Sequence, residues 1–165
     1  TNTEELGETL GDLLEAGGMS ALYAQYANAE TFEEIAQELD PEDASGAMQR
    51  WLFARYFKDK VSPEQMRGWD IGRAAALVRW GHFVGLIDES TAESVLEACA
   101  EEACQRFTGW REFGISYLFG GLFWRMAAGE DAAAEWLDDA ASACVELLTD
   151  EGEWLRYPWV QSLTD

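Results

Sequence analysis

Residues 68–85 read GWDIGRAAALVRWGHFVG and decide how the rest of this chain is interpreted. The stretch carries two arginines against one acid, Asp70, in a chain that is otherwise acidic, and it contains the only histidine. Side chains three and four residues apart share one face of a helix. On that spacing Trp69, Arg73 and Trp80 form one stripe, while several glycines and alanines allow another backbone to approach. The stretch therefore predicts a helix surrounded by other helices.

Helical patterns also dominate outside this stretch. Only three prolines occur, each where a helix would start or a tail would turn, and no run alternates as a strand would. Further helices are expected over residues 3–16, 20–28, 31–39, 41–58, 90–107, 110–126 and 131–148. The expected fold class is all-α, a single compact bundle of about seven helices around a central aromatic helix.

Several helix ends carry recognisable signals. Two Ser/Thr–x–x–Glu capping boxes occur, Thr31 with Glu34 and Ser90 with Glu93. Two pairs combine an N-cap residue with a proline at the first helical position, Asp40–Pro41 and Ser62–Pro63. The pair Gly17–Gly18 is expected to end the first helix.

The central helix is predicted at residues 110–126, which are apolar nearly all round and so indicate burial. Each glycine in a helix is unfavourable by roughly 1 kcal/mol relative to alanine, so a close packing contact is expected at Gly114, Gly120 and Gly121. Buried charges persist when they are paired. Ion pairs are therefore expected among the charged residues of this helix and of the quoted stretch: Asp70, Arg73, Arg79, Glu112 and Arg125.

The net charge of the chain is −21 and is unevenly distributed. Residues 1–49 hold 12 acids and no lysine or arginine, whereas residues 50–86 carry more bases than acids. Nucleic acid and anionic membranes are not expected as partners, because both are bound through clustered Lys and Arg. A basic protein partner fits, since charge of this size steers association. An acidic face that serves only solubility remains the alternative.

No catalytic set is recognisable in the sequence. His82 lies between aromatic residues, which favours packing over a role as a general base, and no nucleotide-binding or nucleophile-elbow fingerprint occurs. The three cysteines form neither a disulfide framework nor a zinc-ligand pattern. We therefore predict no catalytic residue, no metal and no cofactor, and we expect a cytoplasmic location.

Four motifs follow one another along residues 50–160: W-D-x-x-R-A, G-x-x-x-G-x-I-D-E, F-x-x-W-R-E-F-x-x-S-Y-x-x-G, and an aromatic tail with P-W. Their residues are Trp69, Asp70, Arg73, Ala74, Gly81, Gly85, Ile87, Asp88, Glu89, Phe107, Trp110, Glu112, Phe113, Ser116, Tyr117, Gly120, Trp124, Pro158 and Trp159. This set resembles the bacterial domain-of-unknown-function family numbered 1266. The resemblance implies an α-helical bacterial cytoplasmic domain, with some relatives encoded near contact-dependent or type VI secretion systems. Residues 1–49 are then an acidic helical part of one domain, 1–165, whose family-like core is 50–160.

We expect a non-enzymatic binding protein, an immunity protein that neutralises a bacterial toxin by blocking its active site. The missing catalytic set, the uncompensated acids of residues 1–49 and the genomic surroundings that the resemblance implies favour this function. An acidic helix face would act as a phosphate mimic in a basic cleft. The predicted partner-binding residues are Glu33, Glu34, Glu38, Asp40, Glu42 and Asp43, with Asp138 and Asp139 as a second patch.

Two alternatives stay open. A small enzyme or ligand-binding domain would use a polar pocket around Asp70, Arg73 and Glu112, and the third possibility is a structural scaffold protein. One set of residues forms either that pocket or a buried scaffold: Trp69, Asp70, Arg73, Trp80, Trp110, Glu112, Tyr117 and Trp124.

Overall fold

The computed structural model describes residues 2–37, 39–149 and 151–160, and every regular element among them is a helix. The first elements are α1 (Thr3–Gly11), its π-helical continuation η1 (Asp12–Ala16), α2 (Gly18–Asn28), α3 (Phe32–Ala36) and α4 (Ala44–Phe57). A 3₁₀ turn, η2 (Pro63–Met66), then leads into α5 (Arg67–Phe83), α6 (Glu89–Arg106) and α7 (Trp110–Arg125). The last elements are η3 (Met126–Ala128), α8 (Glu130–Leu147) and α9 (Glu153–Arg156). The predicted all-α class is confirmed.

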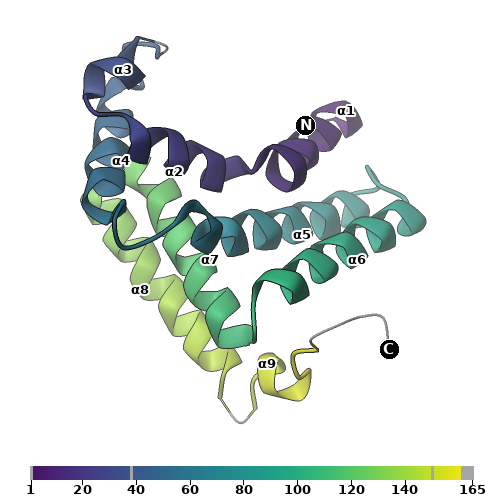
Figure 1. Ribbon diagram of the computed structural model, residues 1–165. Coiled ribbons are helices and arrows are strands. Elements are labelled where there is room, and N and C mark those ends of the chain that lie inside the picture. Colours follow the sequence, from purple (N-terminus) through teal and green to yellow (C-terminus); the bar gives the residue numbers. More distant parts are fainter. Residues whose placement is uncertain (1, 38, 150, 161–165) are drawn as a thin grey trace.

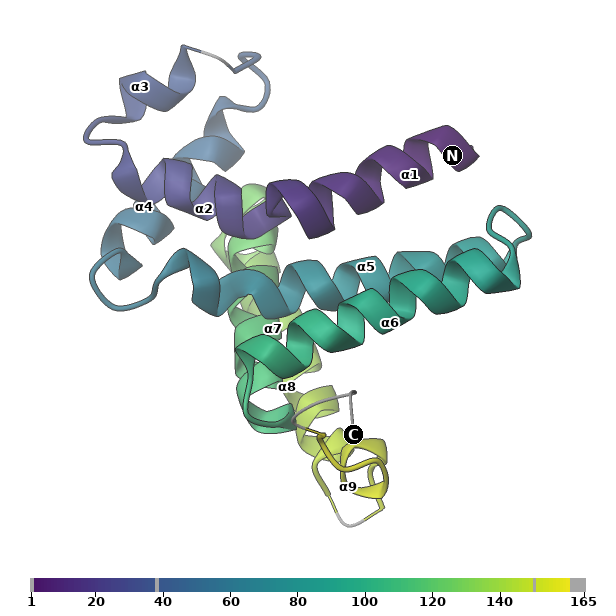
Figure 2. The same cartoon turned by 45° about the vertical axis from the view of Figure 1, so that its right-hand side comes forward.

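The predicted central helix is α7. It packs against α5, runs beside α8, and also contacts α2 and α4 (Figure 1). The helices α5 and α6 form an antiparallel pair that projects away from α7, and α1 lies along α5 (Figure 2). No helix in the described ranges is long and apolar enough to cross a bilayer.

Two apolar cores hold these helices together. One joins α2, α4 and α7 around Tyr23 and Phe123, whose rings meet edge to face with 5.5 Å between centroids. The other joins α1, α5 and α6 around Leu10, Val78 and Cys99. Because α1 and α2 contribute side chains to these cores, the acidic N-terminal part packs with the rest of the chain.

The close contact between α5 and α7 depends on glycines, as the sequence predicts. The Gly68 amide donates to Ser116 Oγ at 2.8 Å, an approach that a side chain at position 68 would block. A Cβ atom at Gly72 would lie 2.8 Å from the Tyr117 ring. Such contacts are shorter than van der Waals separation, so these positions need glycine for the helices to cross this closely.

The first helix ends where the sequence predicts. Gly17 and Gly18 have φ values of +91° and +44°, a region that side chains other than glycine rarely adopt. The break lets α2 leave the direction of η1 and pack onto α4 and α7.

Two predicted caps differ in the structure. The helix α6 begins at Glu89, and its N-cap is Asp88, whose carboxylate accepts from the Thr91 amide at 2.8 Å. The prediction of Ser90 as N-cap is therefore wrong, because a competing acid two residues earlier captures the free amide. At α3, Thr31 occupies the N-cap position but makes no side-chain bond to the helix backbone.

The two proline signals also have different outcomes. The prediction of Asp40–Pro41 as a helix start is wrong, because these residues form a turn in which the Asp43 amide donates to the Asp40 carbonyl at 3.0 Å. The helix α4 begins only at Ala44. Ser62 does cap a helical turn, through a capping box with Gln65, and this 3₁₀ turn runs directly into α5.

Candidate functional site

The predicted acidic surface forms around α3 and the turn that follows it. Five of the predicted carboxylates are exposed there: Glu33, Glu34, Asp40, Glu42 and Asp43. We call these five residues the α3 acidic surface. None of them takes part in an ion pair with another described residue. The sixth predicted residue, Glu38, lies outside the described residues.

Packing on α4 fixes the position of this surface. The Phe32 ring of α3 lies against Trp51 of α4, with 6.1 Å between centroids. Trp51 Nε1 also donates to the Ala29 carbonyl at 3.3 Å, which ties the link before α3 to α4. Glu34 has a local role as well, because its carboxylate accepts from the Glu30 amide at 3.3 Å. The apolar side of α3 is thus held inward and its carboxylates face solvent.

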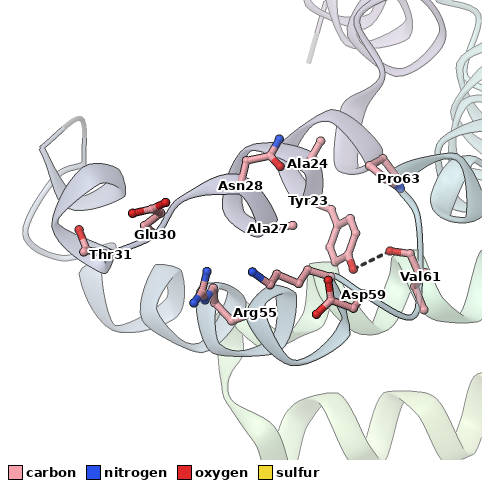
Figure 3. Close-up of a pocket in the computed structure, with 11 residues that line it drawn as sticks. Tyr23, Ala24, Ala27, Asn28, Glu30, Thr31, Arg55, Asp59, Val61 and Pro63 are labelled. Carbon is pink, nitrogen blue, oxygen red and sulfur yellow. Dashed lines mark hydrogen bonds between the residues drawn. The ribbon is translucent and has the colours of Figure 1, made fainter.

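A pocket of about 620 Å³ opens beside the α3 acidic surface, between α2 and the end of α4 (Figure 3). Its lining carries both charges, with Arg55, Lys58 and Asp59 from one wall and Glu30 from the other. The Tyr23 hydroxyl donates to the Val61 carbonyl at 2.9 Å and so helps to close one side of the pocket. The pocket is therefore open and polar.

The second predicted patch lies elsewhere. Asp138 and Asp139 are exposed on α8, which packs against α7, whereas α3 packs against α4. Both views show α3 and α8 at separate places in the molecule (Figure 1; Figure 2). The two acidic patches are therefore separate surfaces.

Asp70 is fully buried and caps α2 from outside the helix. Its carboxylate accepts from the backbone amides of Met19 at 2.7 Å and Ser20 at 3.1 Å, which are amides without an intrahelical partner. Burial raises the pKa of Asp70, while the two amides and Arg67 oppose that rise. The carboxylate is thus committed to holding the η1–α2 junction against α5.

Arg67 is the ion-pair partner of Asp70, at 3.4 Å. The prediction of ion pairs among Asp70, Arg73, Arg79, Glu112 and Arg125 is wrong, because no two of these described residues pair with each other. The buried guanidinium also donates to the carbonyls of Leu13 at 2.8 Å and Leu14 at 3.2 Å, and it binds Glu102 at 2.6 Å. Arg67 thereby satisfies carbonyls at the end of η1, while Asp70 satisfies amides at the start of α2. This buried ion pair is structural.

The alternative polar pocket around Asp70, Arg73 and Glu112 is not assembled. Glu112 is exposed in the first turn of α7, where it accepts from the Thr108 amide at 2.8 Å, a bond that lowers the pKa of Glu112. Arg73 lies over the Trp80 ring, 5.5 Å from its centroid. No ion pair links these groups in the described part of the chain, because Asp70 caps α2 and Glu112 accepts from Thr108, the residue before the N-cap position of α7.

Three of the predicted aromatic residues form one cluster. The Trp69 ring is buried, stacks on Trp124 at 5.3 Å between centroids, and lies 5.0 Å from Tyr117. Trp136 of α8 meets it edge to face at 5.7 Å. These rings fill the junction of α5, α7 and α8, which is a packing role.

Trp110 belongs to a second aromatic cluster near the C-terminus. It stacks on Trp154 at 5.2 Å, meets Trp159 edge to face at 4.7 Å, and donates from Nε1 to the Tyr157 carbonyl at 2.7 Å. These contacts hold the segment after α9 against the start of α7. Trp80 joins neither cluster and is 57% exposed.

The histidine and cysteine side chains, which often serve in catalysis or metal binding, form no recognisable site among the described residues. His82 Nδ1 lies 3.1 Å from the Ile87 carbonyl. The described residues contain no group of three or more His, Cys, Asp or Glu side chains that could hold a metal ion. Burial raises the pKa of Cys99 to about 11, so this thiol is protonated at neutral pH.

Sequence reasoning missed Glu102 and the role of Arg67. These side chains come from α6 and α5 and meet only when the two helices pair. They are 35 residues apart on different helices, so the spacing rules that pair residues within one helix do not relate them. The only signal in the sequence is that a base at position 67 precedes Asp70 by one helical turn.

Comparison with known proteins gives a family and no activity. A family model described as "Protein of unknown function (DUF1266)" matches residues 1–159. The match therefore includes the acidic residues 1–49, which contain none of the four family-like motifs. No curated protein and no solved structure matches the chain.

Proposed function

The chain belongs to the DUF1266 family of proteins of unknown function, and we propose that it is a non-enzymatic immunity protein that binds and neutralises a bacterial toxin. In this proposal the α3 acidic surface enters a basic active-site cleft of the toxin and occupies the place of a phosphate-bearing substrate. The observation that carries it is the group of exposed carboxylates at α3, none of which is in an ion pair with another described residue.

The position of α3 supports such a role. The helix lies at one corner of the molecule and packs on α4, so its acids can enter a concave surface (Figure 2). Carboxylates held on a short, anchored helix lose little freedom on binding, which favours affinity. The net charge of −21 adds long-range attraction to a basic partner and raises the association rate.

The test is co-expression of the tagged chain with the product of the neighbouring gene in bacteria. We expect one stoichiometric partner whose toxicity is abolished. Binding should be strong at 0.1 M salt, where charges interact over roughly 10 Å, and weaker at 1 M, where that distance falls to about 3 Å. A partner that binds equally at both concentrations would contradict recognition through the acidic surface.

Charge reversal locates the surface. The quadruple variant Glu33→Lys, Glu34→Lys, Glu42→Lys, Asp43→Lys is expected to lose both binding and protection. The control variant Asp138→Lys, Asp139→Lys changes exposed acids on α8 and is expected to retain both. Protection by the quadruple variant at wild-type level would overturn the role of α3, and loss of protection only in the control variant would move the site to α8.

A further inference from the structure

A groove of about 660 Å³ lies between α5, α6, α7 and the segment around α9. Its volume is within the range of roughly 300–1,000 Å³ that is typical of small-molecule sites. The lining along α5 extends from Ile71 to Arg79, a span of about 12 Å at 1.5 Å per residue. The groove is therefore long enough for an elongated ligand.

Apolar groups form most of the groove. Small and aliphatic side chains line its middle, among them Ala75, Leu96 and Ala100. Aromatic rings close the end near the C-terminus, where Trp110, Trp154 and Trp159 pack against one another. A ligand in this groove must be largely apolar to displace the water.

The charge of the groove is opposite to that of the molecule. Among the described residues that line it there is no Asp or Glu, although the chain contains 32 of them. Its single cation is Arg79, which forms no ion pair with another described residue. The buried thiol of Cys99 is protonated at neutral pH and adds no negative charge. The groove therefore favours an anion in a molecule that otherwise repels anions.

Two free groups of the groove act only as hydrogen-bond donors. Arg79 offers its guanidinium N–H groups, and Trp159 Nε1 is buried without an acceptor within the described ranges. A hydrogen bond with an ionised partner is roughly twice as strong as one between neutral groups, and Arg79 adds the attraction of its charge to a carboxylate. The anionic end of a ligand is therefore expected at Arg79, with the apolar part directed toward the tryptophans.

We propose that this groove binds an acyl chain with a terminal carboxylate, that Arg79 receives the carboxylate, and that the acyl chain lies over α5 and α6 toward Trp159. The site is distinct from the α3 acidic surface, which packs on α4. The two proposals therefore stand or fall separately.

The first test measures binding of dodecanoate to the wild-type chain by titration calorimetry. The matched probe is dodecyltrimethylammonium, which has the same alkyl chain and the opposite charge. We expect one dodecanoate per chain and no comparable site for the ammonium. Net charge alone would favour the cation, so a preference for the anion would indicate a local positive potential in the groove, where Arg79 is the one cation among the described lining residues. Equal binding of both probes, or no binding of dodecanoate, would overturn the proposal.

Two variants locate the carboxylate. Arg79→Gln removes the cation and is expected to weaken dodecanoate binding by about two- to fivefold, the range for ion pairs of exposed side chains. Arg73→Gln removes a nearby cation on α5 that does not line the groove, and it is expected to leave the affinity unchanged. Wild-type affinity in Arg79→Gln, or equal losses in both variants, would contradict the assigned position.

Alkylation of cysteines gives an independent readout. Cys104 lines the groove and Cys144 does not, while both are partly exposed free thiols. Bound dodecanoate is expected to slow alkylation of Cys104 and not that of Cys144. Ala100→Phe, which fills the groove, should abolish protection while circular dichroism shows that the helices remain. Persistent protection in that folded variant, or equal protection of both thiols, would place the ligand elsewhere.

Discussion

At the scale of single residues, Arg67 shows that the spacing of charged residues in the sequence does not determine which of them form an ion pair. Asp70 has an arginine one helical turn before it and another one turn after it, Arg67 and Arg73, and both spacings allow an ion pair. The structure selects Arg67, because that side chain points at the carbonyls of Leu13 and Leu14 while Arg73 lies over Trp80. The choice depends on where α1 and α2 meet α5.

The variant Arg67→Met tests this role. It would leave buried carbonyls and the Asp70 carboxylate without their partner, which typically reduces stability by about 3–5 kcal/mol. The control is Arg106→Met, whose ion pairs with Glu64 and Glu102 are more exposed and are worth less than about 1 kcal/mol. Urea unfolding followed by circular dichroism measures both. Similar losses in the two variants would show that the buried ion pair is not structural.

The cap of α6 gives a prediction that depends on pH. The bond from the Thr91 amide lowers the pKa of Asp88. An acid with a lowered folded-state pKa contributes stability above its unfolded pKa of about 3.9, and this contribution is lost as the pH falls through the folded value. Asp88→Ala is therefore expected to lower the thermal midpoint by a few degrees at neutral pH, and the difference from wild type should vanish in acid.

Ser90→Ala is the matched control for this cap. Ser90 lies inside α6 in the structure, so its replacement is expected to leave the midpoint nearly unchanged. A larger decrease of the thermal midpoint in Ser90→Ala than in Asp88→Ala would show that Ser90 is the N-cap, as the capping-box pattern predicts.

At the scale of elements, the glycines of α7 have different roles from those of α1. A Cβ atom at Gly121 would overlap the Trp136 ring and would lie 2.7 Å from Trp69, whereas nothing lies within 4 Å of a Cβ atom at Gly7. Both residues are helical, so both reduce helix propensity. Only at Gly121 does the absence of a side chain permit the packing of one helix on another.

Alanine substitution separates these roles. Gly121→Ala is expected to destabilise the chain by about 1–3 kcal/mol, because the surrounding rings must move. Gly7→Ala is expected to stabilise it by up to about 1 kcal/mol through helix propensity. Chemical denaturation of the two variants measures both effects, and an increase in stability in both would contradict the close packing around α7.

At the scale of the whole molecule, the arrangement of helices places two different surfaces apart. The α3 acidic surface lies at the corner formed with α4, while the apolar groove lies where α5 and α6 meet α7 and the segment around α9 (Figure 1). A substitution at one surface is expected to leave the other intact, because among the described residues no helix contributes to both. This separation makes protein binding and ligand binding independently measurable.

Much of the fold could be predicted from local pattern. The helical periodicity, the Gly17–Gly18 break and the Ser62 cap all depend on residues close together in the chain, and the structure confirms them. The Ser90 prediction failed where two polar residues near one helix start competed for the same amide. Local sequence rules identify both Asp88 and Ser90 as possible N-caps of α6. They do not say which one caps the helix, because that depends on the backbone conformation of the preceding turn.

Of the two candidate sites, one could be predicted from the sequence and the other could not. The acids of α3 could be recognised from their density, since exposed charge needs no partner to be identified. The groove could not be recognised, because its lining residues come from helices that are distant in the chain and each lining residue alone resembles ordinary core. The same is true of Glu102, which reaches Arg67 only across the α5–α6 pair.

By itself, the sequence determined that this chain folds as helices packed around an aromatic helix, with its excess acids outside. The physical reason is that the apolar face of each helix and the cost of burying each charged side chain can be read from one segment at a time. Only the tertiary structure decided that Asp70 pairs with Arg67, that Glu112 bonds Thr108, and that an apolar groove between α5, α6 and α7 has Arg79 as the one cation among its described lining residues. Those outcomes depend on how helices cross, and crossing is set by contacts between residues that the chain holds far apart.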